Sequence, residues 1–320
     1  MPCTQVGDGF ADRLAPYACA VRAVRVRVPA KINLQLAVGP RRDDGFHELR
    51  TVFHAVDVHD EVTARPGAGL DLTLTGVGAD ALPADDGNLA WRAAALLAAR
   101  TGVPADAHLA LHKDIPVAGG MAGGSADAAA TLLACARLWA VEADLPALAA
   151  ELGSDVAFPL LGGTAVGTGR GEVLRPVTSA ATLHWVLVPA SFGISAGAAY
   201  AELDRQRAAG TAPEPVGPAD DLLTALATGD LLGVAANLGN DLEPAALALA
   251  PQLAATLDAG QEAGALAGLV SGSGPTCAFL CADAALARSV ADRLVADRLV
   301  AGGHAARTAI GPATGAHVVA

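Results

Sequence analysis

The sequence predicts an α+β protein with two domains. A chain of 320 residues is long enough for two, because one domain usually holds roughly 100–200 residues. Hydrophobic residues make up 52% of the chain and charged residues 17%, as in a folded globular protein. Strand-like and helix-like segments are mixed without the regular alternation of a parallel βαβ sheet, which favours the α+β class. The patterns place the domain division within residues 175–185.

Alternating apolar residues mark the expected strands. Residues 21–28 (VRAVRVRV) alternate apolar and basic side chains, as a half-buried strand does, and Pro29 is expected to end this strand. A loop is expected at residues 39–45, where Gly39 and Pro40 interrupt the pattern. Further extended segments are expected at residues 32–38, 49–58, 70–75, 108–112, 164–167 and 184–189.

The spacing of apolar residues changes to that of a helix at residues 88–100, where Asn88 is suited to cap the first turn. A helix at residues 144–152 is expected to end at Gly153. Residues 209–218 contain Gly and Pro and are expected to form a surface loop. Other helices are expected at residues 125–139, 221–226, 231–238 and 244–262, followed by two strands around a glycine turn at residues 271–280 and a helix containing the repeated sequence ADRLV at residues 291–300.

Charge and composition narrow the class of partner. The formal net charge of −12 disfavours a nucleic-acid binder, because an acidic surface repels phosphate backbones. No apolar run reaches the roughly 18 residues that span a membrane, and residues 1–22 are expected to form a disordered tail. We expect a cytoplasmic protein that binds a small molecule, and we expect it to be a monomer or weak homodimer. Five scattered cysteines without a Cys-x-x-Cys pair favour neither disulfides nor zinc: Cys3, Cys19, Cys135, Cys277 and Cys281.

A glycine-rich segment at residues 116–130 (PVAGGMAGGSADAAA) lies between an expected strand and an expected helix. Glycine allows the backbone to curl closely around a ligand. Ser125 is expected to cap the helix, whose free N–H groups would then form a positive cup for phosphate oxygens. No Gly-Lys-Ser/Thr follows the glycines, so the segment is not a Walker A loop. The alternative is a tight strand-to-helix turn without a ligand.

Three segments resemble the three motifs of the GHMP kinases. Residues 29–62 (PAKINLQLAVGPRRDDGFHELRTVFHAVDVHDEV) resemble the first motif, the glycine-rich segment the second, and residues 271–280 (SGSGPTCAFL) the third. Residues 152–172 (LGSDVAFPLLGGTAVGTGRGE) strengthen the match, which runs in order from about residue 24 to the end. Within the superfamily, the first segment is similar to actinobacterial members that phosphorylate 4-diphosphocytidyl-2-C-methyl-D-erythritol in the non-mevalonate isoprenoid pathway.

The resemblance implies a fold and a pair of catalytic residues. An N-terminal ATP-binding domain related to ribosomal protein S5 domain 2 is expected at residues 23–180, and a C-terminal ferredoxin-like α/β sandwich at residues 181–320. Lys31 and Asp155 match the catalytic lysine and aspartate of the family. Taken alone, Asp155 would be interpreted as a carboxylate at a helix start. The match implies instead that Asp155 takes the proton of the acceptor alcohol and that Lys31 stabilises charge.

ATP, with Mg²⁺, is the co-substrate that the resemblance implies. Ser125 matches a serine near Mg²⁺ and the β-phosphate. Lys113 and Asn88 match positions that approach the adenine, although a solvated strand end and a helix cap are the respective alternatives. Together with these three residues, the expected ATP-binding residues are Pro116, Val117, Ala118, Gly119, Gly120, Met121, Ala122, Gly123, Gly124 and Ala126.

The acceptor is expected to be an anionic, cytidine diphosphate-linked methylerythritol. Phe46 and His47 resemble the pair that binds cytosine, by stacking and by a polar contact. Many relatives have Tyr at Phe46, a second serine at Ala126 and Thr at Ala196, so the hydroxyl groups of those positions are absent here, and Ser195 is the candidate to replace the one at Ala196. With Phe46 and His47, the residues expected to bind the acceptor are Asn33, Ser195, Tyr200, Gly272, Ser273 and Gly274.

Two patterns indicate no function of their own, and two alternative functions are open. Residues 167–172 (GTGRGE) open no helix and are interpreted as a turn. His54 and His59 lack the spacing of metal ligands. One alternative function is that of another GHMP kinase, acting on homoserine, mevalonate or a sugar, none of which carries a base to stack on Phe46. The other is a non-catalytic nucleotide- or RNA-binding module on the same fold.

Overall fold

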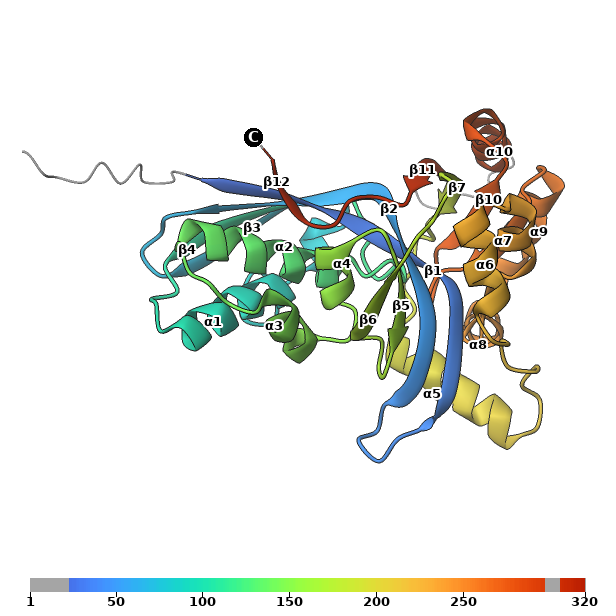
Figure 1. The fold of residues 1–320 in the computed structure, drawn as a ribbon, viewed down its shortest axis with the longest axis horizontal. Coiled ribbons are helices and arrows are strands. Elements are labelled where there is room, and N and C mark those ends of the chain that lie inside the picture. The colour runs from blue at the N-terminus through green and yellow to red at the C-terminus, as the bar shows by residue number, and fades with distance from the viewer. Residues whose placement is uncertain (1–22, 297–305, 320) are drawn as a thin grey trace, which may run out of the picture.

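A computed structural model describes residues 23–296 and 306–319, in which a larger and a smaller sheet lie side by side with helices packed on each (Figure 1). The expected tail at residues 1–22 and residues 297–300, which form all but the first position of the second ADRLV copy, lie outside the described residues. Within them, no helix is long and apolar enough to cross a membrane. The described cysteines are free and buried, and they are Cys135, Cys277 and Cys281.

Two long antiparallel strands, β1 (Val24–Arg41) and β2 (His47–Arg65), form the centre of the larger sheet. The prediction that Pro29 ends the first strand is wrong, because β1 continues through it. The pairing of β1 with β2 shifts register between Pro29 and Ala30. A bulge accommodates proline, which has no N–H to donate to a neighbouring strand.

The larger sheet has the order β12-β1-β2-β4-β3, and β5, β6 and β8 extend it at its side. Both β8 and β12 lie beyond residue 181 in the chain, yet each pairs with β1. The second half of the chain therefore returns to the first sheet twice. The bounds of the added strands are β3 (Leu70–Gly76), β4 (Ala107–Lys113), β5 (Thr164–Thr168), β6 (Val173–Val177), β8 (Gly239–Asn240) and β12 (His317–Val319).

The helices of residues 89–161 form a layer on one face of this sheet (Figure 1). The central helix is buried along most of its length, because its many alanines let it lie close to the strands. Asn88 caps the first helix as predicted: its Oδ1 accepts a hydrogen bond from the N–H of Ala90 at 2.9 Å. The bounds are α1 (Leu89–Thr101), α2 (Gly123–Leu138), α3 (Leu145–Leu152) and α4 (Ala157–Leu161), with a short 3-10 helix η1 (Ala79–Ala81) after β3.

The smaller sheet confirms the predicted ferredoxin-like half. Its order is β11-β7-β10-β9 with every neighbour antiparallel, which is the order of a βαββαβ sandwich. The strand bounds are β7 (Leu183–Val188), β9 (Ala267–Val270), β10 (Cys277–Cys281) and β11 (Arg307–Gly311).

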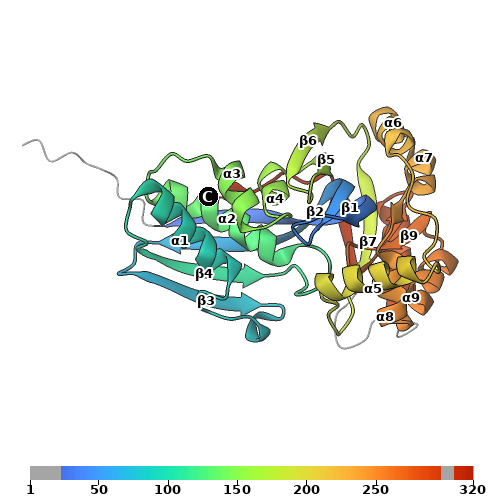
Figure 2. The same cartoon turned by 90° about the horizontal axis from the view of Figure 1, so that it is seen from below.

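The helices of this half differ from the prediction in two places. The expected helix at residues 244–262 is two helices, because the chain breaks at Ala250 and Pro251. Helix α5, which lies beside α8 in Figure 2, was not predicted. The bounds are α5 (Ala196–Ala208), α6 (Asp220–Thr228), α7 (Leu231–Ala236), α8 (Glu243–Leu249), α9 (Gln252–Glu262) and α10 (Ala284–Ala296).

Candidate active site

Two adjoining cavities lie where the two halves of the chain meet. The first, of about 420 Å³, is lined by the glycine-rich segment and is called the loop cavity. The second, of about 580 Å³, is lined by the tip of the β1–β2 hairpin and is called the hairpin cavity. The residues that line both cavities, and so mark their junction, are Leu49, Ser125, Asp155, Ala196 and Tyr200.

Lys31 and Asp155 meet in the loop cavity. The Nζ of Lys31 lies 3.5 Å from Oδ2 of Asp155, although 124 positions separate them in the chain. The Lys31 side chain is only 5% exposed, whereas that of Asp155 is 36% exposed, so the carboxylate is open to a ligand. Phe53 packs below the ammonium, with its ring centre 5.7 Å from Nζ. The structure therefore brings a cation and a carboxylate to one spot.

Hydrogen bonds fix the position of the lysine. Its Nζ donates to Oδ1 of Asn33 at 2.7 Å and to the carbonyl oxygen of Gly120 at 3.1 Å. Asn33 in turn donates from Nδ2 to Oγ1 of Thr51 at 2.8 Å, and Thr51 donates to the carbonyl of Gln35 at 2.8 Å. Asn33 therefore orients Lys31 from the strand, and its side chain reaches the cavity that it was expected to line.

The glycine-rich segment forms the floor of the loop cavity. The prediction that Ser125 caps α2 is wrong: the helix begins two residues earlier, after Ala122, which has a positive φ of 60°. Ser125 therefore lies in the first turn, where its hydroxyl and backbone N–H are not used for capping. The first N–H that bonds within the helix belongs to Ala126. The amides of residues 123–125 are left to bind an anion at the positive end of the helix.

A turn from the second half closes over the glycine-rich segment. A Cβ placed on Gly120 would lie 2.1 Å from the carbonyl oxygen of Ser271, so only glycine fits this close approach. Gly272 has a φ of 55°, and a Cβ there would lie 3.2 Å from the Nζ of Lys31. Asn240 holds the turn by donating to the carbonyl of Gly272 at 2.7 Å. The two halves thus build the cavity together.

His47 and Tyr200 form an aromatic wall of the hairpin cavity. Their ring centres are 5.0 Å apart and their planes differ by 15°. The Nε2 of His47 lies 2.9 Å from Oδ1 of Asp204 in α5, which fixes the imidazole. Burial, together with the charge of Asp155, raises the pKa of the Tyr200 phenol above its ordinary value. Phe46 is half exposed at the mouth, where a planar ring could stack on it.

Sequence reasoning missed several residues that line these cavities, and four of them bear on the chemistry of the site. Asp204 was missed because α5 was not predicted, and Arg170 because its segment was interpreted only as a turn. Thr51 and Phe53 lie on β2, where strand periodicity marks them as core. Local sequence patterns carry no signal for any of these four, since their roles depend on contacts with distant segments.

The structure does not bring every expected residue to the cavities. Asn88 is buried as the cap of α1, while its neighbour Leu89 lines the loop cavity. Lys113, one of only two lysines in the sequence, is also buried. The expected contacts of Asn88 and Lys113 side chains with adenine have no support in this arrangement. The other expected residues that line neither cavity are Pro116, Val117, Met121, Ala126 and Gly274.

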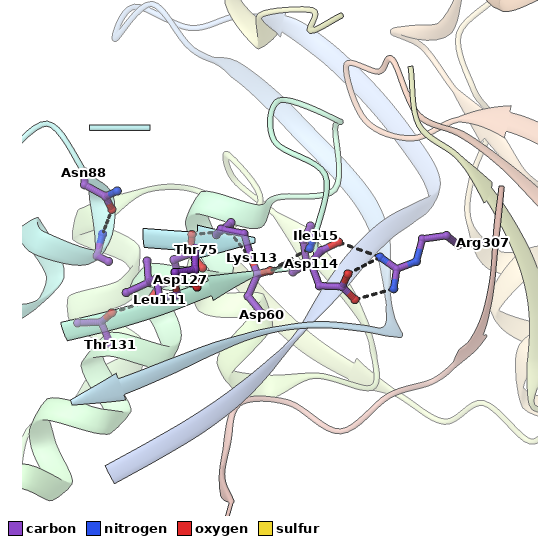
Figure 3. A network of polar contacts seen from close by, with 11 residues as sticks. Asp60, Thr75, Asn88, Leu111, Lys113, Asp114, Ile115, Asp127, Thr131 and Arg307 are labelled. Atoms are coloured by element: carbon purple, nitrogen blue, oxygen red, sulfur yellow. Dashed lines mark hydrogen bonds and ion pairs between the residues drawn. The ribbon is translucent and has the colours of Figure 1, made fainter. Parts of the chain in front are cut away.

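Lys113 is instead the centre of a buried ion cluster beneath α2 (Figure 3). Its Nζ pairs with Asp60 and lies 2.5 Å from Oδ2 of Asp127. Asp60 also accepts hydrogen bonds from the backbone N–H groups of Asp114 and Ile115. The cluster therefore joins β2, the end of β4 and the first turns of α2, and it supports the glycine-rich segment from below.

Asp114 links this cluster to the second half of the chain (Figure 3). Arg307 of β11 donates to both carboxylate oxygens of Asp114, at 2.7 and 2.6 Å. These hydrogen bonds hold the pKa of Asp114 below its ordinary value, although its partial burial opposes them. The paired fork geometry is the most directional contact that arginine makes with a carboxylate. It orients β11 relative to the base of the glycine-rich segment.

The cluster predicts a pH dependence of stability. Burial, which outweighs the attraction of Lys113 and is assisted by repulsion from Asp60, raises the pKa of Asp127 from 3.8 to about 7. Between these values the folded protein binds a proton that the unfolded chain releases, so the contribution of Asp127 to the free energy of unfolding falls as pH rises from about 4 to about 7. Asp127→Asn should remove this component. Urea denaturation from pH 5 to 8 should show the variant gaining stability relative to the wild type as pH rises; parallel profiles would contradict the assignment.

Comparisons with known proteins agree with this architecture. The family models described as GHMP kinases N terminal domain and GHMP kinases C terminal match residues 88–163 and 222–300. The 4-diphosphocytidyl-2-C-methyl-D-erythritol kinase of Salinispora tropica is 58% identical over 299 residues, covering 92% of this chain and 94% of the relative. That of Mycolicibacterium smegmatis is 55% identical, covering 93% and 92%.

Solved structures show the same fold. A crystal structure of 4-(cytidine 5'-diphospho)-2C-methyl-D-erythritol kinase superimposes with a TM-score of 0.73 at 33% identity, covering 90% of this chain and 100% of that one. A homoserine kinase from Cytophaga hutchinsonii has a TM-score of 0.74 at 19% identity, covering 93% and 98%. The second likeness concerns the fold alone, since identity is low.

Proposed function

The chain belongs to the GHMP kinases, in the family of 4-diphosphocytidyl-2-C-methyl-D-erythritol kinases, and on that basis we propose how its residues perform phosphoryl transfer. The reaction moves the γ-phosphate of ATP to the 2-hydroxyl of 4-diphosphocytidyl-2-C-methyl-D-erythritol. The products are the 2-phosphate and ADP.

The approach of Lys31 and Asp155 to 3.5 Å in the loop cavity carries the proposal. Phosphoryl transfer needs positioning and charge stabilisation more than covalent catalysis. The acceptor hydroxyl oxygen attacks the γ-phosphorus while its proton passes to the carboxylate of Asp155. The bond from the γ-phosphorus to the bridging oxygen breaks, and ADP leaves with the electron pair. Lys31 stabilises the charge on the transferred group, because its buried ammonium is held nearby by Asn33 and the carbonyl of Gly120.

The glycine-rich segment is proposed to bind the triphosphate. The free amides of residues 123–125 supply donors at the positive end of α2, and no bulky side chain blocks them. Mg²⁺ usually keeps several waters and takes one or two protein oxygens along with phosphates, and the Ser125 hydroxyl at the cavity junction fits that limited role. When bound, the ion would neutralise phosphate charge. The transfer of the proton and the stabilisation of charge depend on Asp155 and Lys31.

The hairpin cavity is proposed to bind the cytidine end of the acceptor. Phe46 offers a half-exposed ring face, and the His47–Tyr200 pair provides a rigid aromatic wall. Because Asp204 holds His47 at 2.9 Å, the imidazole has a defined orientation toward a polar base edge. The cavity joins the loop cavity at Asp155, so an acceptor bound by its base can place its alcohol beside the carboxylate.

A coupled ADP-release assay tests the proposed substrate. The purified full-length protein is supplied with ATP, Mg²⁺ and one of four acceptors: the cytidylylated methylerythritol, homoserine, mevalonate or galactose. We expect kcat/KM for the cytidylylated acceptor to exceed that of the others by at least about 10³-fold, because they cannot occupy the hairpin cavity. A preparation of Asp155→Asn measures the background of contaminating kinases. Faster turnover of any acceptor without a base would contradict the proposal.

A further inference from the structure

The turn at residues 169–172, between β5 and β6, forms a wall of the active site. Its Gly169 carbonyl accepts a hydrogen bond from the N–H of Leu49 at 2.7 Å, which docks the turn on β2. A Cβ on Gly171 would lie 3.4 Å from the Phe53 ring and 3.9 Å from Oδ1 of Asp155. The turn therefore faces the carboxylate at the junction of the two cavities, and even one added carbon at Gly171 would come within van der Waals range of it.

Arg170 extends from this turn into the hairpin cavity. Its guanidinium carbon lies 4.9 Å from the centre of the Phe46 ring, in a cation–π contact that holds the side chain over the cavity. Within the described part of the chain, its one ion pair joins Nε to Oε1 of Glu172 at 3.7 Å, and its side chain makes no hydrogen bond. Arg307, by contrast, has both ends of its fork occupied. Arg170 thus keeps donors available for a ligand.

An anionic acceptor in the hairpin cavity needs a cationic hydrogen-bond donor. Asp155 and Asp204 line it and would repel an anionic acceptor, in a protein whose formal net charge is −12. The cations that line it are Arg41 and Arg170. Of these, Arg41 is exposed at the hairpin tip and donates a hydrogen bond to the carbonyl of Gly45. Arg170 lies on the turn that faces Asp155, which is the side of the cavity nearest to the reacting alcohol.

We propose that Arg170 is a specificity-determining residue that binds the diphosphate of the acceptor. This inference rests on the proposed function, because the diphosphate lies between the cytidine and the alcohol of that acceptor. With the base on the aromatic wall and the alcohol at Asp155, the diphosphate must pass Arg170. A guanidinium donates two parallel hydrogen bonds to phosphate oxygens. Phe46 has a second role: its ring holds the arginine in position.

The test compares Arg170→Gln with Arg175→Gln. Arg175 is exposed on the adjacent strand β6 and lines neither cavity, so its replacement makes the same change in net charge nearby. In Arg170→Gln, KM for the acceptor should rise about 10- to 100-fold, as for loss of a charge-assisted hydrogen bond. The kcat and the KM for ATP should stay within about threefold, because the loop cavity is unaltered. Arg175→Gln should match the wild type.

Calorimetric binding of CDP and of cytidine identifies the group that Arg170 contacts. Arg170→Gln should weaken CDP binding by about the same 10- to 100-fold and leave cytidine binding within about threefold. Arg170→Lys should fall between the wild type and Arg170→Gln, since it keeps the charge and loses the fork. An unchanged KM for the acceptor, or equal losses for CDP and cytidine, would overturn the inference. If the wild type binds CDP but phosphorylates another acceptor, the proposed function fails while the Arg170 comparison still stands.

Discussion

Asp155→Asn is expected to lower kcat by about 10³-fold, within the range known for loss of a general base. Asparagine has nearly the shape of aspartate, but its amide cannot take the proton of the acceptor hydroxyl. Because the Asp155 side chain is 36% exposed and forms its one ion pair with Lys31 in the described residues, the fold should tolerate the change. The measurement is steady-state turnover of the cytidylylated acceptor under saturating ATP.

Binding measurements separate loss of catalysis from loss of substrate. The affinities of Asp155→Asn for ATP and for CDP should stay within about threefold of the wild type, because neither the glycine-rich segment nor the aromatic wall changes. Circular dichroism spectra should coincide. A kcat within tenfold of the wild type would remove Asp155 from the role of base.

Lys31→Met is expected to lower kcat by about 10²- to 10³-fold, the usual effect of removing one donor that stabilises transition-state charge. The methionine side chain is similar in length and shape to that of lysine but carries no ammonium group. Lys31 donates to Asn33 and to the carbonyl of Gly120, and its side chain is only 5% exposed, so those acceptors lose a partner as well. Some stability should therefore be lost together with turnover.

The free energy of unfolding, measured in urea, separates these two effects. If Lys31→Met is more than about 95% folded under assay conditions, the fall in kcat cannot result from unfolding. Lys31→Arg is the matched comparison, because it keeps the positive charge. Arginine is bulkier than lysine and does not fit the space beside Gly272, where a Cβ added to the glycine would already lie 3.2 Å from Nζ. Turnover of Lys31→Met within fivefold of the wild type would contradict the role of the ammonium.

Local patterns predicted much of the secondary structure, and the exceptions have identifiable causes. The cap at Asn88 and the helix end at Gly153 follow from local backbone chemistry, and both are present. Pro29 was expected to end a strand, but a bulge on the long β1–β2 ladder accommodates it. Helix α5 was not predicted because its apolar and polar residues are not separated onto opposite faces of the helix. Its position is set by packing against α8 rather than by its own periodicity.

The prediction of the candidate site depended more on the resemblance to a family than on local sequence patterns. The glycine-rich segment is recognisable as a potential anion site from its residues alone, although α2 starts at Gly123 rather than at Ser125. The meeting of Lys31 with Asp155 is a contact between distant segments, for which composition and spacing carry no signal. Lys113 matched the family pattern, yet burial and two carboxylates hold its side chain below the loop.

A crystal structure with the cytidylylated acceptor and a non-hydrolysable ATP analogue tests the central claim, which is that Lys31 and Asp155 converge on the acceptor alcohol beside the amides of the glycine-rich segment. We predict a carboxylate oxygen of Asp155 at about 2.6–3.2 Å from the 2-hydroxyl, and the γ-phosphate analogue between Lys31 and residues 123–125. An acceptor alcohol bound away from Asp155, or a triphosphate bound outside the loop cavity, would contradict the account.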